Sequence, residues 1–461
     1  MVLVPFFLGE YFMRKKVDIL TGNIGLNLFK LSLPVILTSL VSILYNLTDI
    51  KFISQYLGDF AVSSAAAATF FIVLSFALLI IPKNGAQLLV AQSIGAKLNK
   101  KARAYARVSL IITFIFSIFC LLISVIFAKN LIQLVGISKV EYLNNAVIFL
   151  RISALGFPFL FLLATMSAII SADGDTFGPF VFNSIGVILN IFLDYLLLGV
   201  FKMGISGAAF ATVISQIVSF LCIAIYLKNP KSKFKHMKIF KLDSYTLYFK
   251  VIKIGIPAGI SQALFTLISI VIANMIASFD ESVLGVQRLG VQFESFSWNI
   301  AGGVSSAVAT YVAQNYGAKQ YDRINNVYNV SVKSISVFGA LISFVFIFFA
   351  RNLYSIFFTQ EDLINYGVAY LQIIGLTQIL QCIEIITTGA FNGIGKINEP
   401  TIIGVIGTGL RIPFIYILAP IFGINTIWWV ISISMLLKGI VSYTWFKFTW
   451  IKFLKERNIY L

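Results

Sequence analysis

One eight-residue phrase occurs twice in this chain and constrains its fold more than any other feature. VAQSIGAK at 90–97 and VAQNYGAK at 312–319 agree at six of eight positions and lie 222 residues apart. The turn from Gly174 to Pro179 recurs 221 residues later, from Gly395 to Pro400. Matching landmarks at a nearly constant distance indicate one half-length unit used twice. We therefore expect two halves of the same fold.

The composition indicates a membrane protein. Of 461 residues, 59% are hydrophobic and 11% are charged, whereas soluble domains carry about 25% charge. Apolar runs of about 20 residues, the length that crosses a bilayer as a helix, recur along the whole chain. We predict an all-α polytopic membrane protein. Two repeats in such a chain are typical of a secondary transporter.

Twelve apolar segments are predicted to span the membrane, six in each half and in the same orientation. They lie at 29–50, 60–84, 104–128, 143–168, 179–200, 204–227, 247–275, 284–310, 327–350, 366–390, 400–421 and 424–448. The expected fold is two parallel six-helix repeats around a central cleft. The predicted parts are an N-terminal cytoplasmic segment (1–28), an N-lobe (29–227), a basic cytoplasmic linker (228–246), a C-lobe (247–448) and a C-terminal cytoplasmic tail (449–461).

The distribution of Lys and Arg predicts which loops face the cytoplasm. With a cytoplasmic N-terminus, the inner segments and their flanks carry 24 of the 35 basic residues and the outer loops and their flanks carry seven. The other four lie within or at the ends of the spans. Basic residues gather in cytoplasmic loops, so we expect both termini inside the cell and the protein in the plasma membrane. The net charge of +17 has the same origin, and we predict no nucleic-acid partner.

Cysteine and histidine give no sign of a metal or disulfide framework. Cys120, Cys222 and Cys382 lie in separate apolar runs, and His236, the one histidine, lies in the linker. The sequence has no CxxC pattern and no His/Asp/Ser set at a membrane surface. We therefore expect no cofactor and no catalytic residue, which argues against a membrane-bound transferase.

Polar residues inside the first span form a stripe. Thr38, Ser42, Tyr45 and Asp49 are spaced by 4, 3 and 4 residues, which places them on one helix face with Asn46 beside them. Such a stripe must face protein or water rather than lipid. An ionised Asp at mid-span costs about 2.5–3.5 kcal/mol, which makes Asp49 a functional candidate.

The fifth and sixth spans carry a second polar set. Asn183, Asn190 and Asp194 share one face of the fifth span, and Thr212 lies in the sixth. Together with Asp49, these oxygens suit a hard cation such as Na⁺, and the two acids equally suit a proton. The alternative is that these groups only form hydrogen bonds between helices.

The second half lacks both acids. At the repeat distance, Asp49 corresponds to a position near Ile272, and Asp194 to a position near Ile415. The two halves therefore share a frame but not the charges. The simplest interpretation is that cation coupling belongs to the first half.

Other ionisable groups lie within the spans. In the second half, the candidate substrate contacts are Gln262, Glu294, Glu384 and Arg411. Pairing Arg411 with one of the glutamates would lower the cost of burial. In the first half, Lys83 follows Pro82 in the second span. It either neutralises one of the two acids or extends its ammonium group to the cytoplasmic surface, and the basic loop that follows favours the surface.

Several stretches resemble the multidrug and toxic compound extrusion (MATE) family. They are LSLPVILTSLVSILYNLTDIKFISQYLG (31–58), LLVAQSIGAK (88–97), SADGDTFGPF (171–180), LNIFLDYLLLGVFKMGISGAAFATVISQ (189–216), IGIPAGISQ and YVAQNYGAKQYDRI. The similarity begins near residue 24 and is closest to the DNA-damage-inducible branch. It implies two six-helix lobes around a cleft, in a superfamily that also contains flippases of lipid-linked oligosaccharides.

The resemblance also implies roles for individual residues. The cation site of prokaryotic members uses an Asp on helix 1, an Asn and an Asp four residues apart on helix 5, and a Thr on helix 6. Asp49, Asn190, Asp194 and Thr212 stand at these positions. Some members carry a second cation site with an acid on helix 7, but here Gln262 is the nearest polar group, so we expect no such site.

These observations predict an antiporter that exports amphipathic, often cationic, organic compounds by alternating access of its lobes, driven by H⁺ or Na⁺. The alternative is a flippase for lipid-linked oligosaccharide or lipid, against which the Asn190 and Asp194 pair argues. We expect a monomer whose partners are a small organic substrate and membrane lipid. The substrate itself is not readable, because 44 Phe and 19 Tyr are spread over the whole chain.

Overall fold

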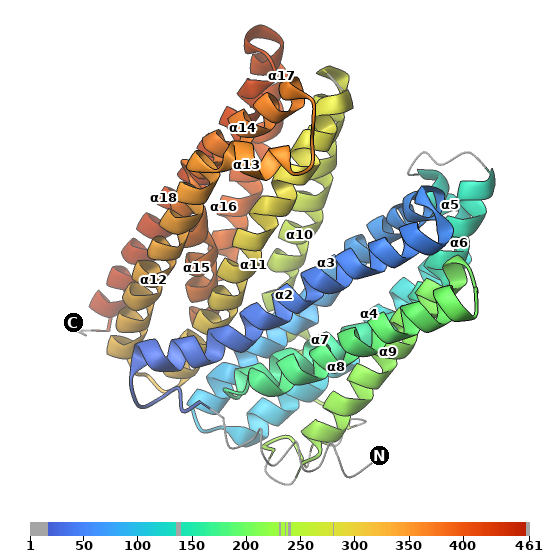
Figure 1. Ribbon diagram of the computed structural model, residues 1–461. Helices are drawn as coiled ribbons and strands as arrows, with labels where there is room; N and C mark the ends of the chain where they lie inside the picture. The colour runs from blue at the N-terminus through green and yellow to red at the C-terminus, as the bar shows by residue number, and fades with distance from the viewer. Residues whose placement is uncertain are drawn as a thin grey trace. The chain divides into compact units, whose positions relative to one another are not determined.

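All regular elements in the described part of the chain are helices (Figure 1). The computed structural model describes residues 17–134, 140–229, 232–235, 237, 241–279 and 281–457. Residues 1–16, much of the predicted linker with His236, and residues 458–461 lie outside this part. The first-half helices are α2 (Ile24–Leu57), α3 (Asp59–Gly95), α4 (Asn99–Ile126), α5 (Ala128–Leu134), α6 (Val140–Ala154), α7 (Phe157–Ala172), α8 (Phe177–Asp194), the π-helix η1 (Tyr195–Val200) and α9 (Ile205–Leu227). The second-half helices are α10 (Tyr245–Phe279), α11 (Glu281–Gly317), α12 (Tyr321–Phe348), α13 (Ala350–Ser355), α14 (Glu361–Gly375), α15 (Gln378–Ile394), α16 (Asn398–Gly409), α17 (Arg411–Phe422) and α18 (Asn425–Lys455).

The helices confirm the predicted all-α membrane fold. Because lipid offers no partner to backbone N–H and C=O groups, a spanning segment must close its hydrogen bonds internally. Within the described residues, nine helices are long and apolar enough to cross a membrane, and two bent helix pairs raise this number to eleven. The remaining predicted span, 284–310, lies within α11, which carries Arg288 and Glu294 among its apolar residues.

Two spans that the sequence predicts as continuous, 143–168 and 366–390, are each broken into two helices. Helices α6 and α7 meet at 48°, and α14 and α15 meet at 53°. At the first break, Pro158 near the start of α7 supplies no N–H group, and its ring excludes a helical turn before it. At the second, the backbone N–H and the hydroxyl of Thr377 both donate to the carbonyl oxygen of Ile374, at 3.1 and 3.2 Å. This tight turn ends α14.

Several helices are longer than predicted. Helix α2 has 34 residues, and α3 and α11 have 37 each, whereas about 20 residues suffice to cross the hydrocarbon core. The predicted bounds followed the apolar runs alone. The helices continue into the more polar sequence at their ends, and α3 runs through most of the first copy of the repeated phrase.

The chain divides into two compact units. The first comprises Leu33–Gly259 together with the residues up to Thr21, and the second comprises Ile260–Leu461 together with Gly22–Ser32. The division by contacts therefore falls inside α10, whereas the sequence places the lobe boundary in the linker at 228–246. The bounds of the two lobes stay a prediction.

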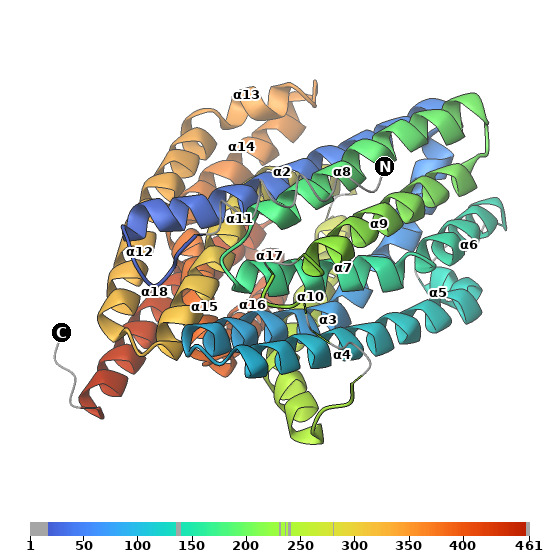
Figure 2. The ribbon, with the colours of Figure 1, turned by 90° about the horizontal axis from the view of Figure 1, so that it is seen from below.

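The same packing order occurs in each unit (Figures 1 and 2). In the first, α3, α4 and α7 contact one another, and α9 contacts α7 and α8. In the second, α11, α12 and α15 contact one another, and α18 contacts α15 and α16. Left-handed backbone positions repeat as well: φ is 59° at Lys97 and 61° at Lys319, and 89° at Gly174 and 84° at Gly395. The sequence repeat is thus also a repeat of local structure.

Two glycines four residues apart let α15 lie close to α11 in the second unit. A Cβ atom at Gly389 would lie 2.4 Å from the carbonyl oxygen of Ser305, and one at Gly393 would lie 2.6 Å from the Cβ atom of Val312. Small residues at this spacing are typical of closely packed helices in membranes. The pair therefore holds these two helices at a fixed distance.

We expect Gly389→Ala to lower the free energy of unfolding by about 1–3 kcal/mol, because the added methyl group overlaps the backbone of α11. The measurement is the thermal unfolding midpoint of the purified protein in detergent. Gly404→Ala is the matched control, since a Cβ atom there meets nothing within 4 Å. Equal midpoints for the two variants would contradict the packing argument.

Candidate functional site

The polar stripe predicted on the first span divides into two groups in α2. The hydroxyls of Thr38 and Ser42 donate to carbonyl oxygens four residues earlier, those of Pro34 (2.8 Å) and Thr38 (2.9 Å). Their hydrogen bonds are therefore made within their own helix. Tyr45 instead reaches α9, where its hydroxyl lies 3.2 Å from the hydroxyl of Thr212. This contact joins α2 to α9 beside the predicted site.

Asn190 and Asp194 lie one helical turn apart on α8 and are buried, with 2% and 0% of their surface exposed. With its amide oriented to satisfy both neighbours, Asn190 donates to Asp194 Oδ2 at 2.9 Å and accepts from the backbone N–H of Thr212 at 3.2 Å. Buried polar groups are normally hydrogen-bonded in this way. The amide fixes the Asp194 carboxyl and holds α8 against α9.

The carboxyl groups of Asp49 and Asp194 lie close enough to act on each other. One oxygen of each, Oδ1, is buried and has no hydrogen-bond partner among the described residues. Two ionised carboxylates at this range repel strongly, and an unsatisfied buried oxygen is costly. The arrangement calls for a positive charge between the two groups, either a shared proton or a metal cation.

The backbone changes at this point. Helix α8 ends at Asp194 and continues directly as the π-helix η1 (Tyr195–Val200), where the sequence predicts one continuous span. A π-helical turn shifts the register of the side chains that follow it, and such turns are frequent at functional sites. Asp194 is therefore the last residue whose position follows the α-helical spacing from Asn183 and Asn190.

The first unit contains a cavity of about 150 Å³ that Tyr45, Asn190 and Thr212 help to line, while neither Asp49 nor Asp194 is among its lining residues. Asn183 lines it, although its amide donates to the carbonyl oxygen of Pro179 at 2.7 Å. The remaining lining residues come from α2, α7, α8 and α9: Ser42, Leu160, Leu163, Gly186, Val187, Ser215, Gln216 and Ser219. The volume is large enough for several water molecules, since each takes about 30 Å³ in the liquid, and for an ion with part of its hydration shell.

Two of the predicted supporting residues are not part of this group. Asn46 is exposed on α2. Lys83 is half-buried on α3, and no ion pair in the described part of the chain joins it to Asp49 or Asp194. This arrangement favours the other alternative, in which the Lys83 ammonium group extends to the cytoplasmic surface, and that alternative stays a prediction.

Among the described residues Arg411 forms no direct ion pair with a glutamate, although Glu294 and Glu384 both act on it electrostatically. Arg411 Nε donates to Ser434 Oγ at 2.9 Å. Glu384 Oε2 lies 3.4 Å from Lys438 Nζ, and Glu294 accepts a hydrogen bond from the hydroxyl of Tyr370. Helix rotation decides these partners, since it turns Arg411 toward α18, where Ser434 is the nearest acceptor.

The last predicted second-half residue, Gln262, is half-buried on α10. Its carbonyl oxygen accepts from the hydroxyl of Thr266 at 3.0 Å, and no hydrogen bond between described residues joins its side chain to the other three candidates. The sequence interpretation missed Lys438 and Ser434. A lysine in the middle of α18 was a usable signal, because intramembrane lysines are rare and seek partners.

Comparison with known proteins agrees with this architecture. The MatE family profile matches residues 34–196 and again residues 257–417. Probable multidrug resistance protein YoeA of Bacillus subtilis is 24% identical over 91% of this chain and 92% of its own length. Probable multidrug resistance protein NorM of Thermotoga maritima is 26% identical over 86% of each chain.

A solved structure has the same fold. An outward-facing multidrug resistance MATE family transporter of the MOP superfamily superposes with a TM-score of 0.89 and 21% sequence identity, over 95% of this chain and 98% of its own. The family profile, matched once in each half, covers most of the chain. This protein is a multi-pass membrane transporter and belongs to the MatE family.

Proposed function

We propose that this protein is a cation-coupled antiporter that exports amphipathic, often cationic, organic compounds by alternating access of its two lobes. The observation that carries the proposal is the meeting of the Asp49 and Asp194 carboxyl groups beside residues that line a polar cavity. A transporter that needs no coupling ion has no reason to bury two acids against each other, at several kcal/mol each. The names of the relatives, which describe multidrug resistance proteins, support drugs as the cargo.

The coupling ion is H⁺ or Na⁺, and the side chains suit both. A proton shared by the two carboxyl groups removes the repulsion between them. A sodium ion takes oxygen ligands, which Asp49, Asp194 and Thr212 supply, with Tyr45 beside them. In both cases the ion leaves the pocket neutral or nearly so, and removing it restores the repulsion between the acids.

Ion binding acts on α2 because this helix carries Asp49, while α8 carries Asp194. With the ion bound, the two acids hold α2 against α8. Without it, repulsion favours an arrangement in which α2 moves away, and the contact between Tyr45 and Thr212 weakens. A helix with two such positions is the bistable element that a coupled exchange requires.

The driving force is adequate. One charge that crosses a potential of 100 mV releases about 2.3 kcal/mol, which corresponds to a substrate gradient of about 50-fold. The exchange of one cation for one neutral molecule therefore sustains useful export even without an ion concentration gradient. We also propose cytoplasmic termini, a plasma-membrane location and a monomeric transporter.

We expect Thr212→Val to raise the ion concentration needed for half-maximal transport by about 10-fold. The change keeps the shape of the side chain and removes the hydroxyl that faces Tyr45. In this proposal the same hydroxyl is a ligand of the coupling ion, and a contact of this kind with a charged group is worth about 1.5–3 kcal/mol. Ion-dependent transport rates in proteoliposomes measure the effect. Thr48→Val is the control, since that hydroxyl donates within α2 to the carbonyl oxygen of Leu44 (2.8 Å). A shift of equal size in both variants would remove Thr212 from the site.

The deciding experiment uses the full-length protein in proteoliposomes with ethidium as the transported probe. A Na⁺ gradient and a proton gradient are imposed separately, with the membrane potential clamped. We expect one of the two ion gradients to drive ethidium transport against the concentration gradient of ethidium itself. Transport that responds to neither gradient contradicts the antiport proposal. Translocation of a lipid-linked sugar in place of ethidium would identify a flippase.

A further inference from the structure

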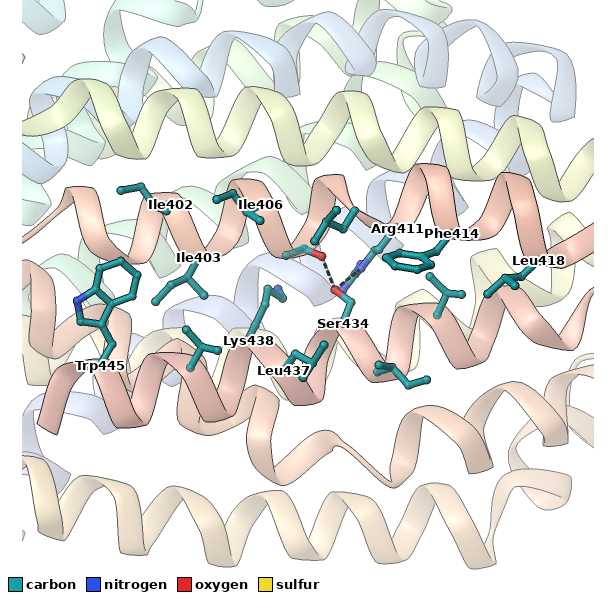
Figure 3. A pocket seen from close by; sticks show the side chains of 15 residues that line it. Ile402, Ile403, Ile406, Arg411, Phe414, Leu418, Ser434, Leu437, Lys438 and Trp445 are labelled. Carbon is teal, nitrogen blue, oxygen red and sulfur yellow. Dashed lines mark hydrogen bonds between the residues drawn. The ribbon is translucent and has the colours of Figure 1, made fainter. Parts of the chain in front are cut away.

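The second unit contains a larger cavity that the proposed ion site does not use. It has a volume of about 470 Å³ and lies between the α16–α17 pair and α18 (Figure 3). Its walls are almost entirely aliphatic and aromatic, and its size is that of a site for a drug-sized ligand. Several of its lining side chains, among them Ile406 (56% exposed) and Leu437 (53% exposed), leave it open along one side.

Four lining residues of this cavity, among them Gly407 and Lys438, stand at the repeat counterparts of residues that line the first-unit cavity. Gly407 follows Gly186 by 221 residues, and Lys438 follows Ser219 by 219, because the loop before the last helix is two residues shorter in the second half. The geometry agrees with this pairing. A Cβ atom at Gly186 would lie 2.0 Å from Ser219 Oγ, and one at Gly407 would lie 2.5 Å from Lys438 Cγ.

The second cavity is cationic at positions where the first is neutral. Arg411 stands where the first half has Asn190, and Ile415 stands where it has Asp194. Lys438 replaces a serine, so two cationic side chains line the second cavity where the first carries an amide and a hydroxyl. In Figure 3 both extend into the space between the helices, on either side of Ser434. A pocket with an apolar wall and a cationic floor is complementary to an anion with an apolar body.

Two acids act on this cationic pair from outside the cavity. Glu384 pairs with Lys438 from α15, and Glu294, bonded to Tyr370, acts on Arg411 from α11. Neither acid is among the residues that line the cavity. A ligand in the cavity therefore meets the positive side of these pairs.

Arg411 has hydrogen-bonding capacity to spare. The residue as a whole is 7% exposed. Within the described part of the chain its one hydrogen bond is from Nε to Ser434 Oγ, and Ser434 in turn donates to the carbonyl oxygen of Gly407 at 2.7 Å. The four N–H donors on its terminal nitrogens have no protein acceptor there. A buried guanidinium whose fork is free suits a carboxylate or phosphate, which it binds through two parallel hydrogen bonds.

We propose that this cavity binds a membrane-soluble organic acid with a single apolar chain or ring body. Its anionic group is held by Arg411 and Lys438, and its apolar part lies along Ile406, Phe414 and Trp445. Binding is a property of the second unit alone and does not depend on the ion site in the first.

Trp445 lines the cavity and provides a local probe. The full-length protein is placed in discs of phosphatidylcholine, and tryptophan quenching is titrated with 12-bromododecanoate, 12-bromododecyltrimethylammonium and 1-bromododecane. We expect the carboxylate to quench at about 10-fold lower concentration than the other two, the fold-change that corresponds to one charge-assisted contact. Trp445→Phe is expected to remove this carboxylate-specific component. Equal quenching by all three compounds reflects partition into lipid alone and overturns the proposal.

Three variants test the named residues. Arg411→Asn and Lys438→Ser copy the first half and are expected to abolish the preference for the carboxylate. Ile406→Trp, at an exposed wall position, fills the cavity without changing its charge, and it is expected to weaken carboxylate binding even if the charge variants fold poorly. Arg351→Gln removes an exposed arginine elsewhere and is expected to change nothing. A preference that survives Ile406→Trp, or that anionic phosphatidylglycerol in the disc abolishes, contradicts the proposed occupant.

Discussion

Asp194→Asn is expected to abolish ion-coupled export while the protein remains in the membrane at its normal amount. The substitution keeps the shape of the side chain and removes the charge that, with Asp49, attracts the coupling ion. Asp194 is fully buried and hydrogen-bonded to Asn190. No water molecule from the solvent can therefore take over the role of the lost carboxylate. We expect the rate of ethidium export against a gradient to fall by about 100-fold or more, which corresponds to about 2.7 kcal/mol.

Asp49→Asn is expected to have the same effect, because one acid alone neither shares a proton nor completes a cation site. The double variant is then expected to be no worse than either single variant, as for residues that act as a unit. Asp322→Asn, an exposed residue in the first turn of α12, serves as the control. Drug resistance of cells and counterflow in proteoliposomes are both measured. Export retained in both single variants would exclude the coupling role of the pair.

The sequence predicted the fold well because its strongest signals are local or periodic. Apolar length predicts a span, and the two copies of VAQSIGAK and VAQNYGAK predict the duplication, which reappears in the paired backbone angles at Lys97 and Lys319. Of the two helix bends, the sequence indicates the one at Pro158 and gives no sign of the one at Thr377. Pro158 was visible, but a proline can bend a helix or end it. The turn at Thr377 has no proline and depends on a side-chain hydrogen bond to Ile374.

For the candidate site too, the sequence identified the residues that share a helix face but not the contacts that depend on how the helices pack. Asp49, Asn190 and Asp194 were identified because helical spacing shows which residues share a face and because buried acids are costly. The structure brings them together with Thr212, and their role as an ion site stays a prediction. The partner of Arg411 was beyond the sequence, since it depends on how α17 and α18 are rotated. Complementary charge suggested a glutamate, whereas the direct hydrogen bond of Arg411 goes to the hydroxyl of Ser434 and the glutamates act on it without a direct bond.

Glu384→Gln is expected to cause the largest loss of stability among single substitutions in the second unit. Lys438 is 8% exposed, and its ammonium group lies 3.4 Å from the Glu384 carboxylate. Removing one partner of a buried ion pair leaves an uncompensated charge, at a cost of about 3–5 kcal/mol. The measurement is the thermal unfolding midpoint in detergent. Glu361→Gln breaks an ion pair of the same type with Arg351, where the side chains are 65% and 60% exposed. It is expected to cost less than about 1 kcal/mol.

The contrast between these two variants separates burial from pairing. If proximity alone gave an ion pair its strength, the Glu361 pair, at 2.8 Å, would matter more than the Glu384 pair at 3.4 Å. Desolvation predicts the reverse order, because water screens the exposed pair and not the buried one. Combining Glu384→Gln with Lys438→Met is then expected to recover most of the lost stability, since the buried charge is removed together with its partner. A double variant as unstable as Glu384→Gln alone would show that Glu384 stabilises this unit by a contact other than its ion pair.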